Sequence, residues 1–219
     1  MQGITNVYLV INRRCALLVD TGYAKNALRV VRFLRENDLG SADLKLIIVT
    51  HSHHDHVGSL AEVKEHFGAQ VLVHENEAVF LRTGITSFPR GTNIIAKTST
   101  WISNAFLNKA CRYRPLEPEI LIAGDVDLSE YGMNVSILGT PGHTAGSISV
   151  IVDNDKALVG DTVFNLFSTI VYPPWADDVE KLQGSWRKLL DKGCRVFYPA
   201  HGLPLPFERL FRKFEQRLK

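Results

Sequence analysis

Four histidines and one aspartate fall within six residues in the stretch IIVTHSHHDHVGSL, which spans residues 47–60. The whole chain has eight histidines, so half of them lie in this short segment. Imidazole and carboxylate groups this close together are typical ligands of zinc, iron and related metals. Residues two apart in an extended segment point the same way, so His51 and His53 are predicted to project together while His54 points elsewhere.

Asp55 and His56 follow as a second pair of ligand types, and two unlike pairs indicate two adjacent metal ions. Two ions need further ligands, and three later loops offer them: His143 in GTPGHTAGSIS, Asp161 in LVGDTVF and His201 in VFYPAHGLP. Each is a lone histidine or aspartate at the end of an apolar strand pattern with glycine nearby. Strand ends are where α/β proteins place functional side chains.

Each of these residues also has an ordinary explanation. A histidine-rich stretch can be a solvated loop, although this one is internal and follows a buried strand pattern. A lone loop histidine is often just a polar residue, and a lone aspartate often caps a helix or a turn. His54, His66 and His74 lack a ligand-like setting, and they are predicted to be structural or surface residues.

The elements that must position these groups alternate between strand and helix patterns. We expect strands at 6–11, 15–20, 44–50, 69–74, 119–123, 133–139, 147–152, 156–161 and 194–200. We expect helices at 24–37, 58–67, 75–83, 179–192 and 206–219. In the first helix, Leu28, Val31, Phe33 and Leu34 are predicted to form the apolar face. The pattern predicts one layered α/β domain over residues 1–219, with much antiparallel sheet.

Composition narrows the class of protein. Hydrophobic residues make up 45% of the 219 residues and charged residues 22%, which is enough for a sizeable core. A net charge of +2 gives no reason to expect a nucleic-acid partner, and no apolar run is long enough for a membrane span. Cys15, Cys111 and Cys194 are widely spaced and odd in number, so we expect free thiols and a cytoplasmic location.

The segment at about 88–118 is irregular and is predicted to be a cap-like insert containing a short helix. Its aromatic residues, together with two later ones, could form a pocket wall over the site: Trp101, Phe106, Tyr113, Tyr172 and Trp175. The alternative is that these aromatics cap the core or a subunit interface. The sequence is therefore compatible with a homodimer as well as with a monomer.

The segments THSHHDHVG, PGHTAGS, VGDTVF and YPAHG, in this order, resemble the motifs of the metallo-β-lactamase superfamily. LLVDTG, with Asp20, is similar to the aspartate that the family keeps on a strand near its site. The resemblance covers about Val7 to Pro204. It implies an α/β (α+β) fold, a four-layered αββα sandwich with the site at one edge between two sheets.

The resemblance also implies a role for each candidate ligand. The seven residues divide into a first metal set, a second metal set and a bridge: His51, His53 and His143; Asp55, His56 and His201; and Asp161. Asp20 would orient a ligating histidine. The metals would be two divalent ions, with zinc expected and iron or manganese as alternatives. They would share a bridging hydroxide that attacks a carbonyl, with Asp55 and Asp161 as the catalytic residues.

The implied activity is hydrolysis of a small ester, thioester or lactone, with a small molecule as the partner. The ligand set resembles those of glyoxalase II and the acyl-homoserine lactonases, whereas true β-lactamases of this family do not use a bridging aspartate. Phe164 stands near the place where the lactonases have tyrosine. Only about one helix follows His201, so we expect weak use of S-lactoylglutathione. The alternative is an iron-dependent persulfide dioxygenase, or another redox or binding role on the same fold.

Overall fold

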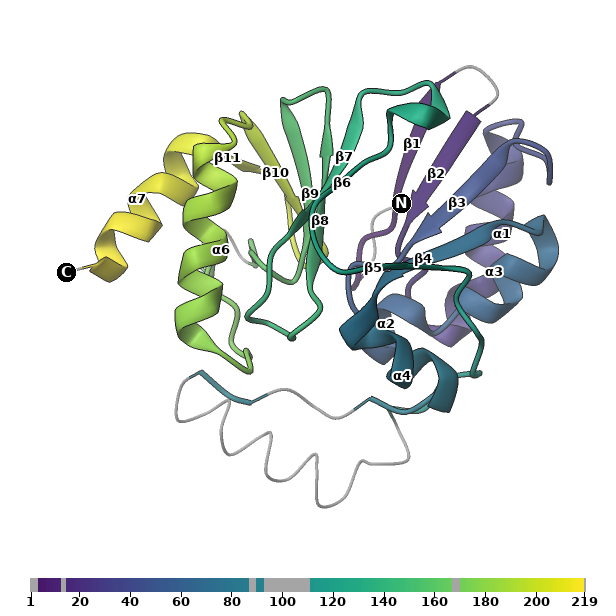
Figure 1. Ribbon diagram of the computed structural model, residues 1–219, viewed down its shortest axis with the longest axis horizontal. Coiled ribbons are helices and arrows are strands. Elements are labelled where there is room, and N and C mark those ends of the chain that lie inside the picture. The colour runs from purple at the N-terminus through teal and green to yellow at the C-terminus, as the bar shows by residue number, and fades with distance from the viewer. Residues whose placement is uncertain (1–3, 13–14, 87–89, 93–110, 167–169, 219) are drawn as a thin grey trace.

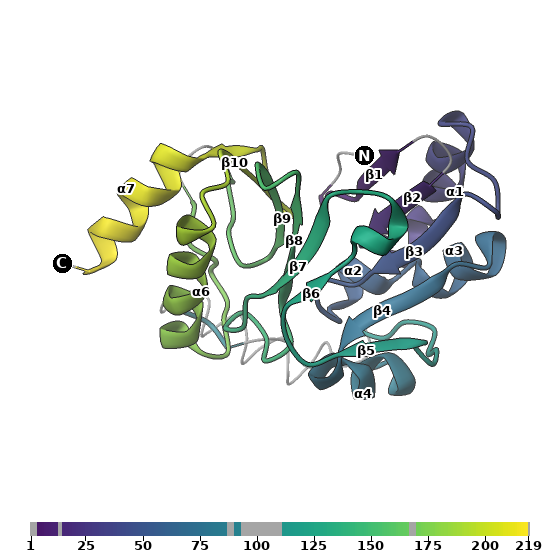
Figure 2. The same cartoon turned by 45° about the horizontal axis from the view of Figure 1, so that its top comes forward.

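A computed structural model describes residues 4–12, 15–86, 90–92, 111–166 and 170–218 of the chain. Two β-sheets pack face to face, and helices cover the outer face of each sheet, so that four layers follow one another across the molecule (Figure 1). The same order of layers is visible when the molecule is turned by 45° (Figure 2). The predicted αββα sandwich is therefore confirmed.

The first sheet contains the N-terminal strands and has the order β1-β2-β3-β4-β5. β1 and β2 form an antiparallel hairpin, and the remaining neighbours are parallel. The strands are β1 (Tyr8–Asn12), β2 (Cys15–Val19), β3 (Leu44–Ile48), β4 (Gln70–His74) and β5 (Ile120–Ile122). The helical segments that accompany them are η1 (Ala24–Asn26), α1 (Ala27–Glu36), α2 (His54–Val57), α3 (Leu60–Phe67) and α4 (Glu75–Thr83).

The second sheet contains the later strands in the order β11-β10-β9-β8-β7-β6. Only β9 and β10 pair in parallel among its described strands, and the other pairs are antiparallel. The strands are β6 (Val126–Asp127), β7 (Val135–Gly139), β8 (Ile148–Val152), β9 (Lys156–Gly160), β10 (Val196–Pro199) and β11 (Leu205–Pro206). The helical segments are η2 (Ser129–Tyr131), α6 (Val179–Asp191) and α7 (Phe207–Leu218).

Strand side chains alternate between two buried layers, which explains why these strands read as continuous apolar runs. In β4, Val71 and Val73 pack against the helices of the first sheet, while Leu72 packs between the sheets. In β9, Val159 packs towards α6, while Leu158 packs between the sheets. The core is therefore three apolar layers inside the four-layered sandwich.

The helices and strands predicted outside the insert are present with shifted ends, but one buried face was predicted only in part. α1 buries Ala27, Val30, Val31 and Leu34, whereas Leu28 is 77% exposed. Leu28 lies about 100° around the helix from Ala27, which places it outside the stripe that faces the sheet. The two-residue strands β6 and β11 and the single turn of α2 were not predicted, because elements this short carry no periodic pattern.

Part of the predicted insert, with Trp101 and Phe106, lies outside the described residues. No helix in the described part of the chain is long and apolar enough to cross a membrane.

The C-terminal ends of five strands meet at one edge of the sandwich. β2 and β3 run in parallel in the first sheet. β7, β9 and β10 share one direction in the second sheet. The loops that follow these ends carry Asp20, His51, His143, Asp161 and His201. The fold thus gathers residues that are far apart in the sequence at a single edge.

Candidate metal centre

The structure brings all seven predicted ligands together in two adjacent groups. The first group is His51, His53, His143 and Asp161, and the second is Asp55, His56 and His201. Within each group, one ligand atom from every residue lies within 4.8 Å of the others. His54, predicted to be no ligand, belongs to neither group, and its ring lies edge-on to Tyr23.

Three ring nitrogens converge in the first group. Nδ1 of His53 lies 2.9 Å from Nε2 of His51 and 3.0 Å from Nε2 of His143. One ring nitrogen cannot share a proton with both neighbours, so a cation satisfies this arrangement better than hydrogen bonds do. Burial lowers the pKa of His51 and of His53 well below the ordinary value, and neighbouring histidines lower it further. Both rings are therefore neutral, which is the form that binds a metal.

Two carboxylates lie beside the histidines of the second group: Asp55, which belongs to it, and Asp161 of the first group. Oδ2 of Asp55 lies 3.3 Å from Nε2 of His201 and 3.7 Å from Nε2 of His56. Burial disfavours charge on both rings, but the two aspartates outweigh it. They raise the pKa of His56 well above its ordinary value and that of His201 to about 10. A dication among these atoms would replace the protons that the aspartates otherwise attract.

Asp161 lies between the two groups. Its Oδ2 is 3.5 Å from Nε2 of His143, and its Oδ1 is 3.4 Å from Nε2 of both His56 and His201. Asp161 Oδ1 and His56 Nε2 are among the few buried side-chain atoms of the described residues that lack a hydrogen-bond partner. Buried polar atoms are rarely left unpaired. The donor set therefore fits divalent cations, with Asp161 facing both groups.

The outward ring nitrogens of three histidines are held by acceptors. Nδ1 of His56 lies 2.8 Å from Asp20 Oδ2, Nδ1 of His143 lies 2.9 Å from the carbonyl oxygen of Trp175, and Nδ1 of His201 lies 2.8 Å from that of Ile4. Carbonyl and carboxylate oxygens can only accept, so each Nδ1 carries a proton, and each Nε2 is the atom that would bind a cation. Such contacts orient metal ligands in proteins.

Asp20 holds the second group in a further way. It is 2% exposed, and besides His56 it accepts hydrogen bonds from the backbone N–H and the hydroxyl of Thr50, both at 2.8 Å. Its φ of 59° is in the left-handed region, which aspartate tolerates better than most residues. Asp20 thus contacts a candidate ligand in the way that the family resemblance implied.

A pocket of about 240 Å³ opens over the two groups. His53, Asp55, His143, Asp161 and His201 form its floor. The pocket walls include several residues that the sequence did not assign to the site: Tyr23, Thr86, Cys111 and Leu166. Phe164 also lines the pocket, with its ring 4.8 Å from that of His201. Within the described ranges, no lysine or arginine lines this pocket.

The aromatic wall was predicted only in part. Trp175 lines the pocket, but Tyr113 is buried in the layer between the first sheet and its helices, where its hydroxyl pairs with Thr86. Tyr172 packs against Trp186 on the outer side of the second sheet. Tyr113 is therefore a core residue and Tyr172 is half-buried against the second core cluster, which composition alone does not reveal. The other predicted wall residues lie outside the described part of the chain.

Comparison with known proteins agrees with this geometry. The family model described as the metallo-beta-lactamase superfamily matches residues 1–201. The probable metallo-hydrolase MJ0888 of Methanocaldococcus jannaschii is 30% identical over 90% of this chain and 87% of that protein. The hydroxyacylglutathione hydrolase GloC of Haemophilus influenzae is 33% identical over 68% of this chain and 61% of that protein.

Among solved structures, the metallo-beta-lactamase family protein TTHA1429 from Thermus thermophilus matches with a TM-score of 0.71 and 25% identity. The match covers 98% of this chain and 74% of that one. The motifs, the two-sheet sandwich and the gathered histidines and aspartates all agree with the family match. This chain belongs to the metallo-β-lactamase superfamily.

Proposed function

We propose that this protein is a dinuclear metal-dependent hydrolase that cleaves a small ester, thioester or lactone, with zinc as its resident metal. The observation that carries the proposal is the placement of Asp161. One of its oxygens lies 3.5 Å from His143 in the first group, and the other lies 3.4 Å from His56 and from His201 in the second. A carboxylate placed in this way suits a bridge between two ions.

When bound, two dications supply a hydroxide near neutral pH and polarise the carbonyl of a substrate. The chain itself contributes two carboxylates that stay ionised beside the pocket. Burial opposes charge on Asp55 and Asp161, but the surrounding histidines outweigh it and hold the pKa of both carboxyls below the usual range. Their charge favours dication binding. Phe164 and Leu166 supply apolar lining beside these carboxylates.

The residues that line the pocket favour a substrate that carries no strong negative charge near its scissile bond. Phe164, Leu166 and Trp175 supply apolar area, and the described lining contains no lysine or arginine. A glutathione thioester carries two carboxylates, whose tight recognition calls for fixed arginine or lysine groups. GloC bears the name of a hydroxyacylglutathione hydrolase. We nevertheless propose that S-lactoylglutathione is a poor substrate here.

A hydrolysis screen tests the proposal. The metal-loaded protein is assayed against thioesters, lactones, phosphodiesters and β-lactams, with the metal content measured on the same preparation. We expect turnover of an uncharged thioester or lactone, and a kcat/KM on S-lactoylglutathione far below the roughly 10⁶ M⁻¹s⁻¹ of well-adapted enzymes. Oxygen uptake with a persulfide, together with bound iron and no hydrolysis, would instead identify a sulfur dioxygenase.

A further inference from the structure

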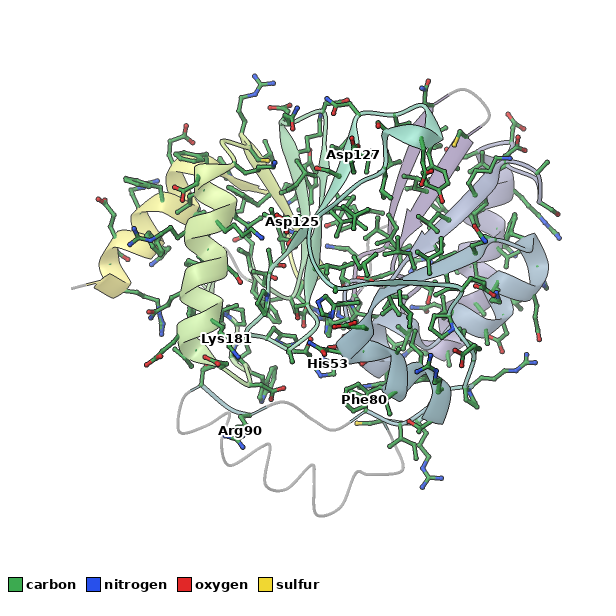
Figure 3. All side chains as sticks on the ribbon, viewed as in Figure 1. His53, Phe80, Arg90, Asp125, Asp127 and Lys181 are labelled. Atoms are coloured by element: carbon green, nitrogen blue, oxygen red, sulfur yellow. The ribbon has the colours of Figure 1, made fainter. Side chains whose placement is uncertain are left out.

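Glu77 is a buried carboxylate that contacts two of the loops around the site. It lies in the first turn of α4 and is only 1% exposed. In Figure 3, His53 lies close to α4, the helix that carries both Glu77 and the labelled Phe80. Buried carboxylates are rare unless several donors surround them, so the contacts of Glu77 call for an explanation.

Three hydrogen-bond donors point at Glu77, and they come from two separate loops. Oε2 accepts from the backbone N–H of Ser52 at 3.0 Å and from its hydroxyl at 2.5 Å. Oε1 accepts from the backbone N–H of Gly146 at 3.1 Å. Ser52 stands between His51 and His53, and Gly146 follows three residues after His143. One carboxylate therefore ties together the loops that carry all three histidines of the first group.

The fit at Gly146 is close. A Cβ atom at this position would lie 2.6 Å from Cγ of Glu77 and 2.9 Å from its Oε1, which is nearer than real contacts allow. Glycine is therefore required for the loop to come within hydrogen-bond distance of the carboxylate. Thr86 fixes the opposite side of the same peptide segment, because its hydroxyl donates to the carbonyl oxygen of Ser52 at 2.6 Å.

The geometry points to Glu77 as the positioning residue of the first metal group. We propose that its carboxylate holds the two loops at the separation that brings His51, His53 and His143 around one ion. Asp20 is a second buried carboxylate at the centre, where it binds Thr50 and His56. Asp20 touches both groups, because the hydroxyl of the Thr50 that it binds lies 3.2 Å from Nδ1 of His51, whereas the hydrogen bonds of Glu77 reach only the loops of the first group.

The inference rests on the proposed metal centre but not on the reaction that it performs. Glu77 binds ligand-bearing loops and contacts no residue of the second group through the hydrogen bonds described. Its loss is therefore expected to weaken metal binding by the first group selectively. A residue that only stabilises the fold would weaken both groups together, so a comparison of the two groups distinguishes the two roles.

The test uses Glu77→Gln, which keeps the shape of the side chain. A carboxylate accepts at both oxygens, whereas the amide presents an NH₂ group to one of the donors and leaves it unpaired. Each group is isolated in turn: His201→Ala leaves the first group intact, and His143→Ala leaves the second. Zinc affinity is measured by calorimetry against a chelator in both backgrounds, and cobalt absorption reports the coordination geometry.

We expect Glu77→Gln to lower zinc affinity about 10- to 100-fold in the His201→Ala background, and to change it less than about threefold in the His143→Ala background. The cobalt spectrum should change only in the first case. Asp20→Asn, which disturbs His56 directly and His51 through Thr50, should lower zinc affinity in both backgrounds. Glu75→Gln serves as the matched control, since Glu75 lies in the same turn of α4 but is exposed, and it should change neither affinity.

Equal losses in the two backgrounds, or no loss in either, would overturn the proposal. Should Glu77→Gln fail to fold, Ser52→Ala removes one of the three hydrogen bonds and should show the same selectivity at smaller size. Zinc binding without any hydrolase activity would refute the proposed function while leaving this inference standing. A wild-type protein that binds no zinc would refute both.

Discussion

Gly160 and Thr50 touch across the gap between the two sheets. A Cβ atom at Gly160 would lie 2.8 Å from Oγ1 of Thr50 and 2.9 Å from its Cβ, and Gly160 has a φ of 50° in the left-handed region. Thr50 in turn donates two hydrogen bonds to Asp20. The close approach at Gly160 therefore helps to set the position of the carboxylate that orients His56.

Gly160→Ala should accordingly destabilise the metal-free protein by about 2–4 kcal/mol, from backbone strain and overpacking against Thr50. Urea unfolding of the metal-free variant measures this loss. Gly184→Ala is the control, because Gly184 lies inside α6 with open space around it, and alanine there should stabilise by up to about 1 kcal/mol. Equal stability of the Gly160 variant and the wild type would show that the sheets can separate without cost.

Asp161→Ala should remove the group that faces both metal sets. We expect the wild type to bind close to two metals per chain, about 3.5 Å apart. The variant should lose turnover and at least one of these metals while its circular dichroism spectrum stays native. Metal analysis of dialysed protein, with Asp191→Ala as an exposed-aspartate control, measures the loss. Near wild-type turnover in a variant reloaded with metal would contradict the bridging role.

The ligand candidates could be predicted because each lies in a short motif next to a strand. His51 follows β3 and Asp161 follows β9, and both strands read as apolar runs of strand length. Parallel or codirectional strands bring such ends to one edge, so local patterns already imply proximity. Asp20, at the end of β2, came instead from the resemblance of LLVDTG to the family motif, and the metal-binding roles themselves stay predictions.

Glu77 could not be predicted in this way. Its partners Ser52 and Gly146 lie 25 and 69 residues away, and their contact depends on how α4 packs against two loops. Within ENEAVFLRT, Glu77 is one of several polar residues near a helix start, where a solvated charge is the usual outcome. The sequence likewise left two places open for Tyr113 and Tyr172, a pocket wall or the core, because an aromatic residue suits both equally well; the structure buries Tyr113 in the core and half-buries Tyr172 against it.

Tyr113 should give the protein a measurable loss of stability in alkali. Burial raises the pKa of Tyr113 from 10.0 to about 12, and its hydroxyl pairs with Thr86. Because the folded pKa lies above the unfolded one, this contribution is complete below pH 10. It is lost as the pH rises towards 12, with a total of roughly 2–3 kcal/mol. Tyr8, whose pKa burial also raises, adds to the trend.

Urea unfolding of the metal-free protein between pH 8 and pH 11.5 tests this expectation, with Tyr113→Phe as the comparison. The variant cannot ionise at this position, so its free energy of unfolding should fall less steeply above pH 10 than that of the wild type. The two slopes should differ by up to about 1.4 kcal/mol per pH unit. Parallel curves for the two proteins would mean that Tyr113 does not titrate differently in the folded and unfolded chains.

Trp175 offers the most direct probe of where the substrate binds. Its side chain lines the pocket, while its backbone carbonyl holds His143, so Trp175→Ala removes apolar wall and keeps the carbonyl. Loss of apolar contact with a substrate should raise KM about tenfold, within the 1–3 kcal/mol expected for partial burial of a large side chain, while metal content stays unchanged.

Tyr172→Phe is the contrasting variant, because Tyr172 packs against Trp186 away from the pocket, and its KM should match the wild type. Steady-state kinetics on the best substrate of the screen, with metal analysis of each variant, measures both KM values. A KM that moves with Tyr172 and not with Trp175 would place the substrate on the outer side of the second sheet and reject the pocket over the metal centre.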